Sequence, residues 1–177
     1  MSLYYLISSL PLLEFDQPPQ ITADAFLKAC REQVGGATAD AVEALMSGAP
    51  SGHPFVKAWR GKDTLLRNAV ARARARGAGV DPERWLRPVQ EAPDAYLERL
   101  VEDAFLQPDP FRMERMLDKA RWAILEEMQG LNLMDAKAVL AYAVKLSLAW
   151  RWANLDAGRG QEAFGRLTLL PDGLITV

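Results

Sequence analysis

Apolar residues recur at intervals of three and four along most of the chain, the spacing that places them on one face of an α-helix. The strongest pattern runs from 111 to 129, and the almost continuously apolar stretch from 134 to 155 predicts a buried core helix. Shorter helices are predicted at about 22–34, 38–46, 55–76, 81–88 and 93–105. Gly61 lies inside the third of these and leaves open whether that segment is one helix or two.

The two ends of the chain do not have this pattern. The run Leu3–Leu10 is short and apolar, so it is either a strand or the first turns of a buried helix. At the other end, Pro171–Gly173 lies between two short apolar runs, which indicates either a hairpin turn or a flexible apolar tail. Periodicity does not decide between these alternatives.

The pattern as a whole predicts an all-α fold, an antiparallel helical bundle. Short β segments at the N-terminus and a C-terminal hairpin are open alternatives. We expect a single helical domain over 1–177. Within it, the loop 47–52 suggests sub-lobes at 1–52 and 53–166, and 167–177 is a tail or a hairpin.

Composition removes several classes of function. The chain has 177 residues with one Cys and one His, so an intramolecular disulfide is impossible and a Cys/His zinc cluster lacks ligands. Cys30 lies in a helical stripe and His53 in a loop, and nothing in their spacing brings them together. We therefore expect no catalytic residues, no cofactor and no metal, and a net charge of −2 argues against a nucleic acid partner.

Charge is unevenly distributed along the chain. The one basic stretch contains Arg67, Arg72, Arg74, Arg76, Arg84 and Arg87. It is either a docking face for an acidic partner or a phosphate backbone, or simply a solvated face of a helix. The acidic stretch 91–127 also carries several basic residues, so ion pairing is favoured there over acid–base catalysis. Trp150 and Trp152 are two residues apart and face different directions, so one of them is available for an interface.

The chain shows no targeting or membrane-spanning pattern. The apolar start, Met1–Leu13, has no Lys or Arg and is too short to cross a bilayer. The apolar stretch 136–153 contains Lys137, Lys145 and Arg151, as expected for a buried helix rather than a span. We expect a cytoplasmic protein without direct membrane insertion. Peripheral attachment to the inner membrane through a complex is an open alternative.

Several segments resemble a bacterial family of unknown function that is encoded among the subunits of V/A-type ATPases. They are 4–12, which reads YYLISSLPL; 66–74, LRNAVARAR, followed by 80–83, VDPE; 113–122, MERMLDKARW; and 141–152, AYAVKLSLAWRW, followed by Asp156 and Gly160. The helix at 113–122 is similar to one in the central-stalk adaptor subunit of those ATPases. The order and spacing of the segments carry the resemblance.

The resemblance implies a non-catalytic helical subunit or accessory protein of an ion-transporting V/A-type ATPase. It is expected to resemble the adaptor subunit that joins the central stalk to the membrane ring, and to bind other protein subunits. Candidate docking residues are Tyr4, Tyr5, Leu10, Arg67, Arg72, Arg74, Arg76 and Trp152. Charge reversal at Arg72 and Arg76 is expected to weaken assembly without unfolding the domain. Two other functions stay open: a helical protein–protein adaptor unrelated to ATPases, and a small-molecule enzyme or ligand-binding bundle with a deep pocket.

Overall fold

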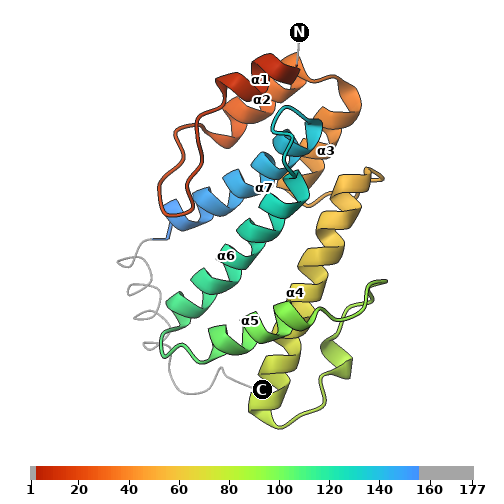
Figure 1. Cartoon of the computed structure of the whole chain (residues 1–177), viewed down its shortest axis with the longest axis vertical. Helices are drawn as coiled ribbons and strands as arrows, with labels where there is room; N and C mark the ends of the chain where they lie inside the picture. The colour runs from red at the N-terminus through yellow and green to blue at the C-terminus, as the bar shows by residue number, and fades with distance from the viewer. Residues whose placement is uncertain (1–2, 156–177) are drawn as a thin grey trace, which may run out of the picture.

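Helices make up all the regular structure in the computed structural model, which describes residues 3–155 (Figure 1). They are α1 (Leu3–Ser9), α2 (Ala23–Gln33), α3 (Gly36–Ser47), α4 (Pro54–Ala78), α5 (Ala95–Phe105), α6 (Pro110–Gln129) and α7 (Ala136–Ala153), with a short 3₁₀ helix, η1 (Glu83–Trp85), between α4 and α5. Residues 3–155 contain no strand, so the all-α prediction is confirmed for them.

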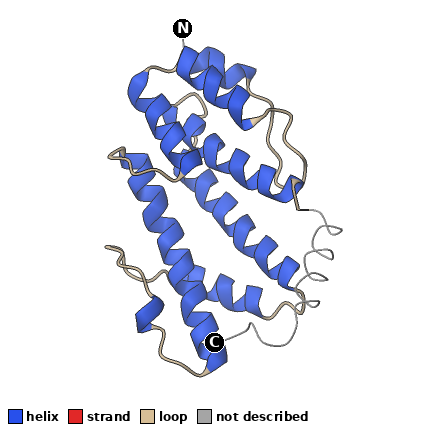
Figure 2. Ribbon diagram, turned by 180° about the vertical axis from the view of Figure 1, so that it is seen from behind, coloured by secondary structure: helices blue, strands red, loops and turns tan. Residues whose placement is uncertain are grey.

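The helix α6 runs through the middle of the molecule and packs against α4, α5 and α7 (Figure 1). The helices α1, α2 and α3 gather at one end, where α3 and α1 pack on α7. At the other end, α5 packs across α4 and α6, and η1 lies beside the last turns of α4 (Figure 2). Because α6 packs on α5 at this end and on α7, the helix against which α1 and α3 pack, α6 and α7 together link the two ends.

Two alternatives left open by the sequence are resolved. The run Leu3–Ser9 is helical, with Leu6 fully buried, so the strand alternative is wrong there. The helix α4 continues through Gly61 without a break. A Cβ at Gly61 would lie 3.0 Å from Glu91 Oε1, so the glycine leaves room for the Glu91 carboxylate beside the helix. The predicted hairpin or tail at 167–177 lies outside the described residues.

Short polar side chains define where the helices begin. Thr22 Oγ1 accepts from the backbone N–H of Ala25 at 3.2 Å and starts α2. Asp94 Oδ1 accepts from the N–H of Tyr96 at 2.8 Å and starts α5. His53, the only histidine, starts α4 in the same way, because its Nδ1 accepts from the N–H of Phe55 at 3.2 Å. Each of these caps satisfies a helix N–H that has no partner within the helix.

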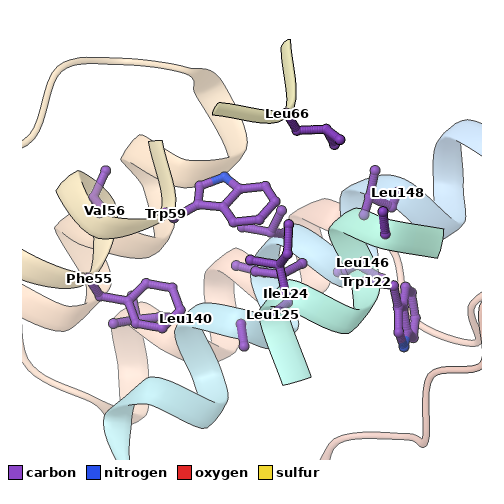
Figure 3. Packing of buried hydrophobic residues seen from close by; sticks show 14 of the residues in the cluster. Phe55, Val56, Trp59, Leu66, Trp122, Ile124, Leu125, Leu140, Leu146 and Leu148 are labelled. Atoms are coloured by element: carbon purple, nitrogen blue, oxygen red, sulfur yellow. The ribbon is translucent and has the colours of Figure 1, made fainter. Parts of the chain in front are cut away.

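One hydrophobic cluster holds the helices together. Large side chains of α4, α6 and α7 point toward one another in Figure 3, among them Trp59, Leu125 and Leu140. The cluster includes residues from both of the sub-lobes expected at 1–52 and 53–166. Cys30 belongs to it with 1% of its surface exposed, and burial raises the pKa of its thiol to about 12. Cys30 is therefore a small apolar packing residue in this fold.

Candidate functional site

The basic stretch divides between two sides of α4. Arg72 and Arg76 are directed at α5, where Arg72 Nε donates to Glu98 Oε1 at 2.9 Å and Arg76 Nη1 donates to Glu102 Oε1 at 2.7 Å. The Arg72 side chain is only 23% exposed. These two arginines, expected to be docking residues, already have carboxylate partners within the chain. A charge reversal there would break contacts between α4 and α5, so it does not isolate a docking function.

Arg67, Arg74 and Arg87 line a groove instead, together with Trp85 and residues of α4 and α6. The groove has a volume of about 520 Å³. Arg74 and Arg87 have no carboxylate partner among residues 3–155. Arg67 Nε lies 2.6 Å from Asp63 Oδ2, one turn earlier on α4. Of the predicted basic surface, the part that carries charges without a carboxylate partner among residues 3–155 is therefore the side of α4 that lines the groove.

Asn68 holds the wall of this groove in place. Its side chain is 4% exposed and makes two hydrogen bonds with the backbone of Arg87, each 2.9 Å long. Nδ2 donates to the Arg87 carbonyl oxygen, and Oδ1 accepts from the Arg87 N–H. Because the amide satisfies both backbone groups, the segment that carries Trp85 and Arg87 is fixed against α4.

A buried ion-pair network lies beside the groove and joins α4, α6 and α7. Arg121 Nε donates to Asp63 Oδ1 at 2.9 Å and Arg121 Nη1 to Asp118 Oδ1 at 2.6 Å. Arg151 Nη1 donates to Asp118 Oδ2 at 2.8 Å, and Trp152 Nε1 donates to the same oxygen at 3.0 Å. The Asp118 side chain has no exposed surface, so its charge is balanced by these donors rather than by water.

Arg121 stays positively charged in this network. Burial lowers the pKa of its guanidinium, but the carboxylates of Asp63 and Asp118 raise it by more, and the pKa lies above its ordinary value. The acidic stretch therefore does contain ion pairs, as the sequence predicts. The pair of Arg121 with Asp118 lies within α6, three residues apart. The pairs of Arg121 with Asp63 and of Arg151 with Asp118 connect different helices, which local spacing does not reveal.

A second groove lies at the α1 end of the molecule and has a volume of about 320 Å³. Its lining is mostly apolar and includes Leu10, Leu12 and Leu133. Leu12 is 82% exposed and Leu133 is 55% exposed. The loop that carries Leu133 also exposes Leu131 and Met134. We call Leu12, Leu131, Leu133 and Met134 the apolar end face.

The polar side chains that line this second groove are Glu126, Gln129, Tyr142 and Lys145. Tyr142 and Lys145 both have partners. Tyr142 Oη donates to the Pro11 carbonyl oxygen at 2.9 Å, and burial raises the pKa of Tyr142 to about 12. Lys145 Nζ lies 3.4 Å from Glu126 Oε1 and 5.1 Å from the ring centroid of Trp122. Burial lowers the pKa of Lys145, and Glu126 partly opposes this shift.

The remaining predicted docking residues lie apart from the basic groove. Tyr4 and Tyr5 are exposed on α1, while Leu10 is partly buried against the core. Trp152 is also used within the chain, since its ring packs edge-on against Phe111 with centroids 5.1 Å apart and its N–H is bonded to Asp118. The expectation that Trp152 is available for a partner is thus weakened by its internal contacts.

Several residues of these surfaces were not predicted from the sequence. Trp85 lies between Arg84 and Arg87, and an aromatic residue within a basic stretch is the sequence signal that could have identified it as part of a binding surface. Leu131 and Leu133 lie between the two strongest helical patterns, and neither belongs to the apolar face of either helix. Packing of those helices therefore does not account for these leucines, and their position is a signal of an interaction surface. Asn68 gives no such signal, because its partner is a backbone segment 19 residues away.

No group of three or more His, Cys, Asp or Glu side chains within residues 3–155 is arranged to hold a metal ion. Over the same part of the chain, every helix is either too short or too polar to cross a bilayer.

Comparison with known proteins gives one match. Residues 93–170 match the model of a family described as a protein of unknown function (DUF2764). The matched region begins just before α5 and includes α6 and α7, and it is less than half of the chain. The description of that family names no activity and no partner, so the resemblance to the adaptor of a rotary ATPase stays a prediction. No curated protein and no solved structure matches the chain.

Proposed function

We propose that this chain is a non-catalytic helical subunit or accessory protein of a V/A-type rotary ATPase, resembling the adaptor of the central stalk. The assignment to that class of complex comes from the sequence resemblance in the segments 4–12, 66–74, 80–83, 113–122 and 141–152. The structural observation that supports an adaptor role is the apolar end face, an exposed group of leucines beside a groove.

The apolar end face is suited to a protein partner. Leu131 is fully exposed and Leu12 nearly so, although both are among the most hydrophobic side chains in the chain. An exposed apolar cluster beside a groove is typical of an interaction surface, because docking removes that surface from water. Tyr4 and Tyr5, exposed on α1, are of the type that is enriched at protein interfaces.

The body behind this face is suited to transmit force. In this proposal it is the antiparallel bundle that the sequence predicts. The network around Asp118 and Arg121 ties α4, α6 and α7 together, and α6 packs on α5 and on α7, the helix against which α1 and α3 pack. Closely packed helices with buried ionic cross-links resist deformation. An adaptor between a stalk and a membrane ring requires that stiffness and requires no catalytic groups.

Purification of the tagged full chain from its native cells tests the proposal. Subunits of a V/A-type ATPase should co-purify with the wild-type chain, and the double variant Leu12→Glu/Leu133→Glu should recover at least about tenfold less of them, because charges in an apolar contact oppose docking. Leu106→Glu is the matched control, since Leu106 is 79% exposed at the end of α5, outside this face. Recovery of other proteins with no ATPase subunit would instead favour a helical adaptor unrelated to ATPases.

A further inference from the structure

The basic groove has the dimensions of a small-molecule site. Its volume of about 520 Å³ lies within the roughly 300–1,000 Å³ usual for ligand pockets. Its floor is formed by small and branched apolar side chains of α4 and α6, namely Val70, Ala71, Ala75, Ala78 and Leu117. An apolar floor with a few polar groups at the rim is the usual construction of a site for an organic ligand.

The polar groups at this rim are mostly arginines. Arg74 and Arg87 are exposed and lack a carboxylate partner within the described part of the chain, so the groove carries two uncompensated positive charges. Arg67 adds a third guanidinium, which Asp63 balances from one side. Arg121 also lines the groove and is neutralised by Asp63 and Asp118. Among residues 3–155, Glu114 is the one acidic side chain in the lining, and it is paired with Arg151. The groove therefore favours an anion.

Trp85 supplies a flat aromatic surface beside these charges. Its side chain lines the groove and is 47% exposed. The Arg84 guanidinium lies 4.6 Å from the ring centroid, so cation–π attraction steadies the indole. The Asn68 amide fixes Arg87, two residues further on, against α4. Trp85 and Arg87 are thus held on one wall, opposite the helix that carries Arg74.

We propose that this groove binds a phosphate ester of a flat aromatic compound, as a nucleoside phosphate is. A phosphate ester carries about two negative charges at neutral pH, which matches the two arginines that lack a carboxylate partner within residues 3–155. Guanidinium groups bind phosphate oxygens through paired hydrogen bonds, so Arg74 and Arg87 hold the phosphate. The aromatic ring stacks on Trp85 above the apolar floor. This site is separate from the apolar end face, and it does not depend on the proposed partner complex.

Calorimetric titration of the full chain with ADP, adenosine and inorganic pyrophosphate tests the proposal. ADP contains both recognised parts, so it should bind at least about tenfold more tightly than either of the other two probes. Arg74→Ala and Arg87→Ala should each weaken ADP binding about tenfold, the usual effect of losing a charged hydrogen bond. Trp85→Ala should weaken it comparably, and Trp85→Phe should retain most of the affinity.

The controls are arginines of similar exposure outside the groove. Arg99→Ala on α5 and Arg112→Ala on α6 should leave ADP binding unchanged, and circular dichroism verifies that all the variants are folded. No binding of ADP to the wild-type chain, or binding that survives Arg74→Ala and Arg87→Ala, would overturn the proposal. Poly-L-glutamate is the competing probe: if it binds through Arg74 and Arg87 while ADP does not, the groove is a docking site for an acidic protein segment.

Discussion

Arg151 Nη1, near the end of α7, donates to Oδ2 of the fully buried Asp118 on α6 over 2.8 Å. The same carboxylate accepts from Arg121, which in turn reaches Asp63 on α4. A single aspartate is therefore the centre of contacts among three helices. Removing its charge would leave Arg121, whose side chain is 15% exposed, with one charged partner fewer in a poorly hydrated site. Arg151 is 47% exposed, so water compensates its charge more readily.

Asp118→Asn should destabilise the chain by about 3 kcal/mol, chiefly because it leaves the charge of the largely buried Arg121 undercompensated. Glu114→Gln is the control, since Glu114 contacts only the outer side of Arg151 and its loss should cost less than about 1 kcal/mol. Urea unfolding of both variants measures the difference. Equal losses of unfolding free energy in the two variants would show that the Asp118 network stabilises the chain no more than the exposed pair of Glu114 with Arg151 does.

Asn68→Ala should detach the wall of the basic groove, because the backbone N–H and carbonyl of Arg87 lose their partners. The expected cost is about 1–3 kcal/mol of stability. Limited proteolysis should also cut faster between α4 and α5 than in the wild-type chain. Unchanged cleavage in this segment, measured by mass spectrometry of the fragments, would argue against the role of Asn68 as a clamp.

The ion pair between Arg72 and Glu98 should stabilise the contact of α4 with α5. Arg72→Glu places two carboxylates together at side chains that are less than one quarter exposed, and it should cost about 1–2 kcal/mol. The exchange Arg72→Glu/Glu98→Arg should restore most of that loss in urea unfolding. Arg76→Glu is the matched comparison, and because this pair is largely exposed it should have a much smaller effect.

Tyr142 should ionise with a pKa of about 12, because burial disfavours its charged form. The folded state holds this proton more tightly than the unfolded state, whose tyrosine has the ordinary pKa of 10.0. Stability from Tyr142 is thus complete below pH 10 and is lost as the pH rises from there to about 12. Ultraviolet titration of wild type and Tyr142→Phe should differ by one tyrosinate step near 12. A difference centred on pH 10 would contradict this.

The sequence predicts most of the fold, because the apolar periodicity that identifies helices is a local property. The patterns at 111–129 and 134–155 coincide with α6 and α7 to within two residues. The glycine at 61 could not be interpreted in the same way, since its role depends on Glu91, which is 30 positions further along the chain. Residues 3–9 are ambiguous between a helix and a strand, because seven residues are too few to distinguish the 3.6-residue period of a helix from the two-residue period of a strand.

The candidate site was less predictable. All six arginines of the basic stretch were recognised, but a row of charges does not reveal which side chains are satisfied by another helix. Arg72 and Arg76 have carboxylate partners on α5, 26 residues away, whereas Arg74, between them on the chain, faces the groove. Arg72 and Arg76 are four residues apart and share one side of α4, whereas Arg74 lies on the other side. Which of the two sides has its positive charge neutralised depends on where α5 packs.

Site-specific photo-crosslinking in the native cells tests the central claim most directly. A photoreactive amino acid at Leu131, the most exposed residue of the apolar end face, should crosslink to a subunit of a V/A-type ATPase, identified by mass spectrometry. The same amino acid at Leu106, at the far end of α5, is the control and should give little of that product. Crosslinks from Leu131 to unrelated proteins alone, or equal ATPase crosslinks from both positions, would contradict the account.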